Sequence, residues 1–167
     1  MCQIYEASKN EKGDAQVQNI EPLFRTYKDD VYRLALSYTR SVQEAEDVCQ
    51  TVFVKLMEQE QITPGKEKAW LMQVTANECR NLLRSSWWRK TAQLDETIPA
   101  QPLRDSGVYQ AVMGLAPKYR VVVYLRYYEA CTTQEIAQLL KISQSAVTTR
   151  LNRARQTLKE QLKEVSV

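Results

Sequence analysis

Apolar residues recur every three or four positions over most of the chain, the spacing of one face of an α-helix. The clearest stripe follows Ser41-Val-Gln-Glu44, a pattern typical of a capped helix start. The members of this stripe are Ala45, Val48, Cys49, Val52, Phe53, Leu56 and Met57. The outward-facing residues of the same helix include Asp47, Gln50, Thr51 and Lys55. The pattern therefore predicts an amphipathic helix with one buried and one polar face.

Two further helices are expected in the first half of the chain. A long stripe between Val17 and Arg40 predicts one helix or two closely joined helices. A Thr-Pro-Gly loop within Glu60 to Lys68 precedes a helix from about Glu67 to Lys90. The core side of that helix is marked by Met72, Ala76, Cys79 and Leu83.

Apolar periodicity is weak in two segments. Residues 1–16 are polar, and we expect a disordered N-terminal tail there. Residues 91–107 contain two prolines and a glycine without helical spacing, which indicates an interdomain linker. The chain is thus predicted to be all-α, with two small helical domains at residues 17–90 and 108–167 joined by a flexible linker.

The second domain has the pattern of a helix-turn-helix. A helix ending at Met113 and one from Lys118 to Glu129, opened by Pro117, come first. Thr132-Thr-Gln-Glu135 is a capping box for a short helix through Leu140. A tight turn, Lys141-Ile-Ser143, then leads into a final helix whose buried stripe is Val147, Leu151, Ala154, Leu158 and Leu162. A plain helical hairpin is the alternative, but the turn length and the basic outer face favour DNA binding.

Composition argues against catalysis. The chain of 167 residues has no histidine, which removes the commonest general base and any His-paired nucleophile. Its four cysteines are scattered and form no CxxC pair, so we expect reduced thiols, no metal and no cofactor. Neither a signal peptide nor a membrane-spanning run is recognisable, which predicts a cytoplasmic protein.

Positive charge gathers in the C-terminal third. Residues 1–58 hold 7 Lys and Arg against 10 Asp and Glu, whereas residues 108–167 hold 9 against 4. A basic region of this kind fits a polyanion such as DNA, although a charged run is also compatible with a solvated helix face.

Four motifs resemble one protein family. Val31-Tyr-Arg-Leu-Ala-Leu-Ser-Tyr with the helix after Ser41 looks like the polymerase-binding segment of extracytoplasmic-function sigma factors, a group of the sigma-70 family. Ala69-Trp-Leu-Met-Gln-Val-Thr-Ala-Asn77 looks like their −10 segment. Leu115-Ala-Pro-Lys-Tyr-Arg120 and Arg150-Leu-Asn-Arg-Ala-Arg155 are among the motifs that look like their −35 domain. The match runs from about residue 20 to 162 in the family's order and spacing.

The resemblance implies a sigma factor that binds core RNA polymerase, recognises the −35 and −10 promoter elements and helps to open the −10 DNA, in a stress response. It would carry out no chemistry of its own and act on no small-molecule substrate. Its expected partners are the clamp region of the largest polymerase subunit, the flap region of the second, double- and single-stranded promoter DNA, and an anti-sigma protein that could hold it at the membrane.

The resemblance also assigns roles to individual residues. Polymerase binding falls to Asp47, Gln50, Thr51, Phe53 and Lys55. Contacts to the −10 element fall to Lys66, Lys68, Trp70, Asn77, Arg80 and Arg84. Contacts to the −35 element fall to Gln144, Ser145, Thr148, Thr149, Asn152 and Arg153. The sequence departs from the family pattern at four places: Thr51 for a usual Glu, Glu67 for a common aromatic residue, Ser145-Ala146 for Gly-Thr, and Thr148 for a basic residue.

Three alternatives stay open at this level. Trp70 either packs in the core or lines the DNA channel, and Trp87 and Trp88 either stack on DNA or bury a helix end. A different transcription regulator would need a ligand or phosphoacceptor domain in place of residues 17–90. A purely protein-binding helical module would leave the basic outer face of the last helix without a role.

Overall fold

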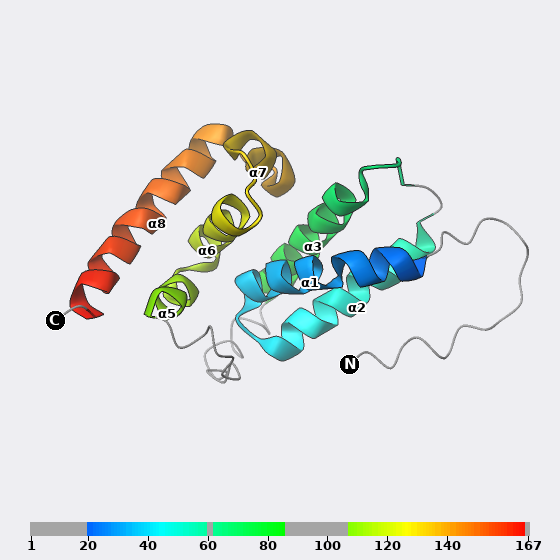
Figure 1. The fold of residues 1–167 in the computed structure, drawn as a ribbon, viewed down its shortest axis with the longest axis horizontal. Helices are drawn as coiled ribbons and strands as arrows, with labels where there is room; N and C mark the ends of the chain where they lie inside the picture. Colours follow the sequence, from blue (N-terminus) through cyan, green and yellow to red (C-terminus); the bar gives the residue numbers. More distant parts are fainter. Residues whose placement is uncertain (1–19, 60–61, 86–106, 166–167) are drawn as a thin grey trace, which may run out of the picture.

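The computed structural model describes residues 20–59, 62–85 and 107–165, and all regular structure in these ranges is helical. The first unit, residues 20–85, contains α1 (Ile20–Thr39), α2 (Val42–Glu58) and α3 (Glu67–Arg84). The second unit, residues 107–165, contains α5 (Gly107–Gly114), α6 (Pro117–Val123), the π-helix η2 (Tyr124–Tyr128), α7 (Thr133–Leu140) and α8 (Gln144–Val165). The predicted all-α class with two helical units is confirmed (Figure 1). The predicted N-terminal tail, most of the linker, and Trp87 and Trp88 lie outside the described residues.

The first unit is a three-helix packing in which α1 contacts both α2 and α3. The stripe predicted for α2 is buried at Ala45, Val48, Val52, Phe53 and Leu56. Ser41 caps the helix as expected, because its Oγ accepts a hydrogen bond from the Glu44 N–H at 3.3 Å. The rings of Phe24 and Phe53 meet edge to face, with centroids 4.8 Å apart, and they join α1 to α2.

The second unit has the predicted helix-turn-helix in α7 and α8. The capping box is complete, since Thr132 Oγ1 accepts from the Glu135 N–H and the Glu135 carboxylate accepts from the Thr132 N–H. Lys141 ends α7 in the left-handed conformation with φ of 53°, which turns the chain sharply. Ser143 then caps α8 by accepting from the Ala146 N–H at 3.1 Å.

One predicted helix is divided. The sequence predicts a single helix from Lys118 to Glu129, whereas α6 ends at Val123 and continues as η2. The widened turn is closed by bonds from Glu129 N–H to the Tyr124 carbonyl at 3.2 Å and from Cys131 N–H to the Leu125 carbonyl at 2.9 Å. π-Helical turns of this kind often occur at functional sites. Here the turn places the Glu129 carboxylate against the Tyr124 hydroxyl, 2.6 Å away.

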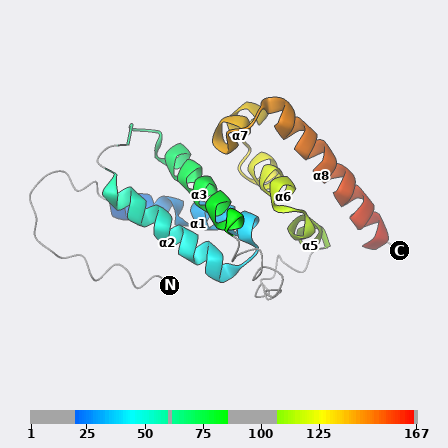
Figure 2. The ribbon, with the colours of Figure 1, turned by 180° about the vertical axis from the view of Figure 1, so that it is seen from behind.

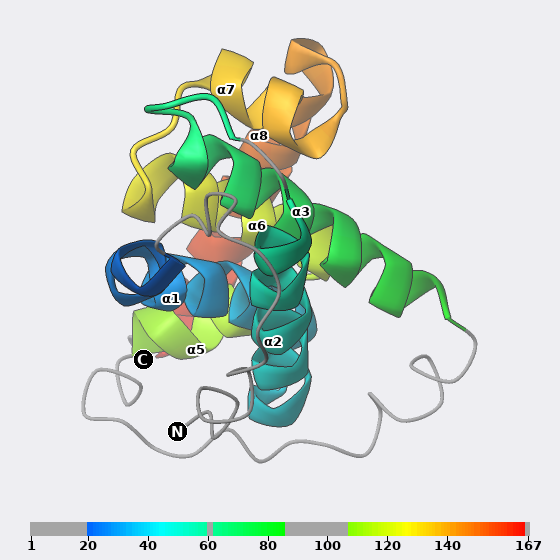
Figure 3. The same cartoon turned by 90° about the vertical axis from the view of Figure 1, so that its right-hand side faces the viewer.

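The two units lie side by side. α1 and α3 face α6 and α7, while α8 lies on the far side of α6 from the first unit (Figures 1 and 2). The view in Figure 3 shows α2 crossing α3 on the other side of the first unit. Buried apolar residues of both units form one contiguous core cluster. Within the described residues, no helix is long and apolar enough to cross a membrane.

Candidate nucleic-acid and polymerase interfaces

The outer face of α8 carries the six residues predicted to contact the −35 element. All of them are exposed: Gln144, Ser145, Thr148, Thr149, Asn152 and Arg153. The opposite face is buried through Val147, Leu151 and Ala154, so the helix is fixed from behind and its polar side remains accessible. An exposed polar face on the second helix of a helix-turn-helix is the geometry that enters a major groove.

Neighbouring groups orient two of these side chains. Gln144 Nε2 donates to Thr133 Oγ1 at 2.8 Å and so ties the start of α8 to α7. Asn152 Oδ1 accepts from Arg155 at 3.2 Å, and the Arg155 Nε donates in turn to the Tyr127 hydroxyl at 2.8 Å. With its oxygen engaged, the exposed Asn152 amide keeps its NH₂ group as a donor for acceptors such as those of a base edge.

The predicted −10 residues on α3 differ in their surroundings. Arg80 donates to the Asn77 amide oxygen and to the Leu140 carbonyl, the latter at 2.6 Å. Lys68 lies 3.1 Å from an Asp30 carboxylate oxygen and 2.8 Å from one of Glu129. The hydrogen bond to Glu129 raises the pKa of Lys68. Lys68, Asn77 and Arg80 are therefore engaged by protein groups, and Lys68 and Arg80 by groups of the second unit.

The other three predicted −10 residues are Lys66, Trp70 and Arg84. Lys66 is exposed at the helix start, and Arg84 is exposed in its last turn. Trp70 is half-buried and packs against the core cluster, so its ring has an inner contact and an accessible part. Packing in the core and lining of the DNA channel, the two roles considered for Trp70, are both compatible with this position.

The predicted polymerase-binding residues are not equivalent. Asp47, Thr51 and Lys55 are exposed and Gln50 is half-buried on α2. Lys55 forms an ion pair with Glu78 of α3 at 2.6 Å. Phe53 is only 8% exposed and packs on Phe24, so its ring belongs to the core and supports the helix from inside. Four of the five predicted polymerase-binding side chains thus belong to the polar face of α2.

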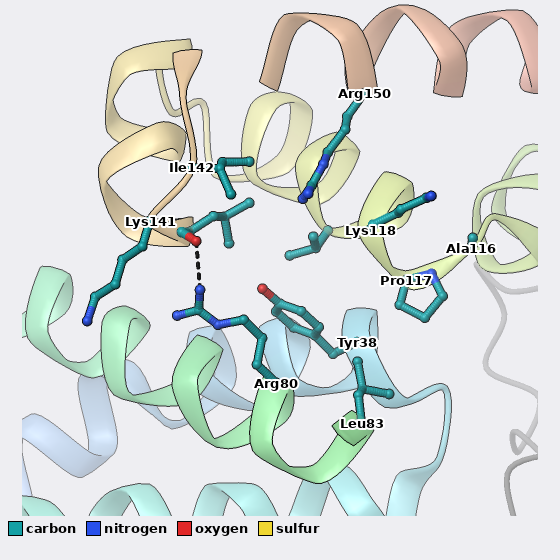
Figure 4. A pocket seen from close by; sticks show the side chains of 11 residues that line it. Tyr38, Arg80, Leu83, Ala116, Pro117, Lys118, Lys141, Ile142 and Arg150 are labelled. Atoms are coloured by element: carbon teal, nitrogen blue, oxygen red, sulfur yellow. Dashed lines mark hydrogen bonds between the residues drawn. The ribbon is translucent and has the colours of Figure 1, made fainter. Parts of the chain in front are cut away.

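A basic cleft of about 430 Å³ lies between the units (Figure 4). Its cationic lining residues are Arg80, Lys118, Lys141 and Arg150, and none of its lining residues is acidic. The Tyr38 hydroxyl points toward its centre (Figure 4), and burial raises the pKa of that phenol. Sequence reasoning did not find this cleft, because its residues come from five separate helices and only the packing of the two units brings them together.

The three cysteines within the described residues, Cys49, Cys79 and Cys131, are free thiols. Cys79 is fully buried in the core, and burial raises the pKa of its thiol far above the ordinary value. Cys49 and Cys131 are half-buried. Among the residues that the structure describes, no group of three potential metal ligands is assembled.

Comparison with known proteins identifies both units. The family model described as Sigma-70 region 2 matches residues 23–89, and that described as Sigma-70, region 4 matches residues 107–158. The RNA polymerase sigma-E factor of Streptomyces avermitilis is 30% identical over 162 residues, covering 88% of this chain and 87% of that protein. The ECF RNA polymerase sigma factor SigE of Mycolicibacterium smegmatis is 27% identical over 162 residues, and the chain spans 63% of its length.

Solved structures support the same fold. The sigma factor RpoE of Bartonella quintana, in complex with the anti-sigma factor NepR, superposes with a TM-score of 0.71 at 20% identity, over 88% of this chain and 98% of that one. CnrH in complex with the cytosolic domain of CnrY gives a TM-score of 0.59 at 22% identity. The two matched regions, in this order, and the similarity to named sigma factors along nearly the whole chain show that the protein belongs to the extracytoplasmic-function group of sigma-70-type RNA polymerase sigma factors.

Proposed function

We propose that this chain binds core RNA polymerase and directs it to promoters by contacting a −35 element with α8 and a −10 element with α3. The observation that carries the proposal is the pairing of a sigma-70 region 4 match with an exposed polar and basic face on α8. The chain performs no chemistry in this role, because its contribution is binding and strand capture.

Base reading at the −35 element falls to the middle of the exposed face of α8. Thr148, Asn152 and Arg153 follow one another at helical spacing, and the start of the helix offers N–H groups to a phosphate. The neighbouring Arg153 side chain lowers the pKa of the exposed Tyr119 phenol.

Opening of the −10 element requires that an unstacked base find a new partner. Asn77 offers a donor and an acceptor on a polar face of α3, and Arg80 and Arg84 on the same helix can neutralise phosphates. Trp70, half-buried next to this face, is accessible for stacking. These roles need Arg80 and Lys68 to exchange their present protein partners for DNA.

The polar face of α2 is proposed to lie on the clamp region of the largest polymerase subunit. Asp47 and Gln50 are one helical turn apart, and the exposed Val54 lies on the same side of the helix one turn further along. A partly apolar helix face with a few polar groups suits a protein interface of this type. By analogy with the two solved structures in which the sigma factor is bound to a protein partner, we also propose that a dedicated inhibitory protein binds this chain.

The test of polymerase binding is a pull-down titration with core enzyme. The double variant Asp47→Ala, Gln50→Ala should bind core enzyme about tenfold or more weakly, about 1.4 kcal/mol. Its matched control removes one carboxylate and one amide from the exposed far end of α8, as Glu160→Ala, Gln156→Ala, and should bind like the unmodified chain. Equal affinity of both double variants would refute the assignment of α2. Run-off transcription from genomic fragments with core enzyme tests the function as a whole.

A further inference from the structure

We propose that the basic cleft is a binding site for a small organic anion that carries at least two linked phosphate groups. In this site the phosphates contact Arg80, Arg150 and the hydroxyl of Tyr38, and the organic part packs on the apolar wall of the cleft. The proposal goes beyond promoter recognition and does not depend on it, because it concerns a ligand of the free chain.

Positive charge in the cleft is not balanced by acidic side chains. The cations among its lining residues are Arg80, Lys118, Lys141 and Arg150, and no described Asp or Glu lines it. None of these four cations forms an ion pair within residues 20–59, 62–85 and 107–165, whereas Lys55 in the same ranges is paired with Glu78 at 2.6 Å. A recess lined by charge of one sign concentrates the electrostatic potential and attracts ions of the opposite sign. The expected ligand is therefore an anion.

Two arginines enter the cleft from opposite sides (Figure 4). Arg150, on α8, is half-buried and has no hydrogen-bond or ion-pair partner among the described residues. Arg80, on α3, uses three of its five N–H groups in bonds to protein oxygens, which leaves two for a ligand. The planar fork of a guanidinium matches two oxygens of one phosphate group. A pair of arginines in this arrangement therefore suits two linked phosphates.

The Tyr38 hydroxyl is a donor in a buried position that lacks a protein partner. Tyr38 is only 4% exposed, and its hydroxyl makes no hydrogen bond to the described part of the chain. The hydroxyl points into the cleft between the two guanidinium groups (Figure 4). Burial raises the pKa of this phenol, and the nearby charges of Arg80 and Arg150 offset only part of the rise, so the hydroxyl is protonated at neutral pH. Because buried polar groups normally have a hydrogen-bond partner, this hydroxyl indicates an anionic oxygen of a ligand at the same place.

The size of the cleft and the rest of its lining indicate an organic phosphate. A volume of about 430 Å³ is within the range in which pockets hold small organic molecules. Four positive charges exceed the charge of a single phosphate group, about −1.5 to −2 at neutral pH, and match two or three linked groups. The apolar wall, which can cover a ring, consists of Leu83, Ala116, Pro117, Val121, Leu140 and Ile142.

The recessed position of the donors favours a small anion over a DNA backbone. Lys118 and Lys141 are exposed and lie on the two sides of the cleft, whereas Tyr38 is buried between them (Figure 4). The phosphates of a duplex contact side chains on accessible faces, such as the outer face of α8. A hydroxyl at the depth of Tyr38 is reached instead by a small molecule that enters the cleft.

The experiment is an isothermal titration of the full-length chain with three probes: ADP, inorganic pyrophosphate and adenosine. It is done without divalent cations at about 20 mM salt, where charge interactions are weakly screened. Arg150→Gln removes one charge of the cleft, and Tyr38→Phe removes one oxygen and no protein hydrogen bond. Neither residue is an assigned DNA or polymerase contact. Arg126→Gln and Tyr128→Phe, at exposed positions of η2 outside the cleft, are the matched controls.

We expect ADP to bind with a Kd below about 1 mM, and about tenfold or more tightly than either pyrophosphate or adenosine. Arg150→Gln and Tyr38→Phe should each weaken ADP about tenfold, because each removes a hydrogen bond to a charged group, and the two controls should bind ADP like the unmodified chain. Absence of ADP binding, equal affinity for adenosine and ADP, or equal affinity for pyrophosphate and ADP would overturn the proposal. It is also overturned if ADP does not bind while Arg150→Gln weakens binding of a fluorescein-labelled single-stranded 12-mer, since the cleft would then hold DNA. If Arg150→Gln loses its circular dichroism at 222 nm, Tyr38→Phe decides the outcome.

Discussion

Replacement of Arg120 by methionine gives the most direct measure of what its buried guanidinium contributes to stability. The variant keeps a long apolar stem but leaves four carbonyls, those of Ser37, Tyr38, Met113 and Leu115, without their donor. A buried acceptor left unsatisfied costs about 1–3 kcal/mol, so the four together could cost roughly 4–12 kcal/mol. Removal of a buried charge returns several kcal/mol of desolvation free energy. We therefore expect the free energy of unfolding to fall by about 2–4 kcal/mol.

The assay is urea denaturation followed by circular dichroism at 222 nm. Arg126→Met is the matched control, because Arg126 is exposed and donates to a single carbonyl, that of Cys131, at 2.9 Å. The control should change the free energy of unfolding by about 0.5 kcal/mol or less. Arg120→Lys should restore only part of the loss, since an ammonium group cannot reproduce the planar arrangement of guanidinium donors. A loss below about 1 kcal/mol for Arg120→Met would contradict the view that these bonds stabilise the fold.

Four further predictions concern single side chains. Thr132→Ala should lower the free energy of unfolding by about 1 kcal/mol in the same assay, because it removes the cap of α7. The hydrogen bond from the Thr132 backbone lowers the pKa of Glu135. The stabilisation by this carboxylate is therefore present above its ordinary pKa of 4.5 and is lost as the pH falls through the lowered value. Urea midpoints measured from pH 6 to pH 3 should show this loss, and Glu135→Gln should abolish it. Leu71→Ala, at a fully buried position, should cost about 2–5 kcal/mol of unfolding free energy, and a smaller loss would mean that the site collapses around the cavity. Arg153→Ala should relax preference at one or two −35 positions by about 1–3 kcal/mol in binding to single-base variants, whereas an equal loss for every variant with a shallower salt dependence would mark Arg153 as a phosphate contact only.

Much of the architecture is determined locally and was therefore predictable from the sequence. The predicted stripe that begins at Ala45 is buried as far as Leu56, with Cys49 half-buried, whereas Met57 at its end is 51% exposed. The caps at Ser41, Thr132 and Ser143 start their helices where the side chains predict. Such signals depend on residues within one or two helical turns of each other, so they can be recognised without knowledge of the fold. The same holds for the polar outer face of α8, which follows from the position of its buried stripe.

Tertiary structure alone decided how the two units meet. A single arginine within an apolar stretch gives no indication that Arg120 reaches the end of α1, some 80 positions earlier in the chain. The π-turn that positions Glu129 beside Lys68 is likewise absent from the helical periodicity, which predicted an unbroken helix. Phe53 shows the same limit of sequence reasoning. The resemblance to sigma factors assigned it to the polymerase-binding surface, whereas its ring is buried against Phe24. Contacts between distant segments depend on which helix ends and charges face one another after packing, and a local pattern of apolar and polar residues contains no information on that choice.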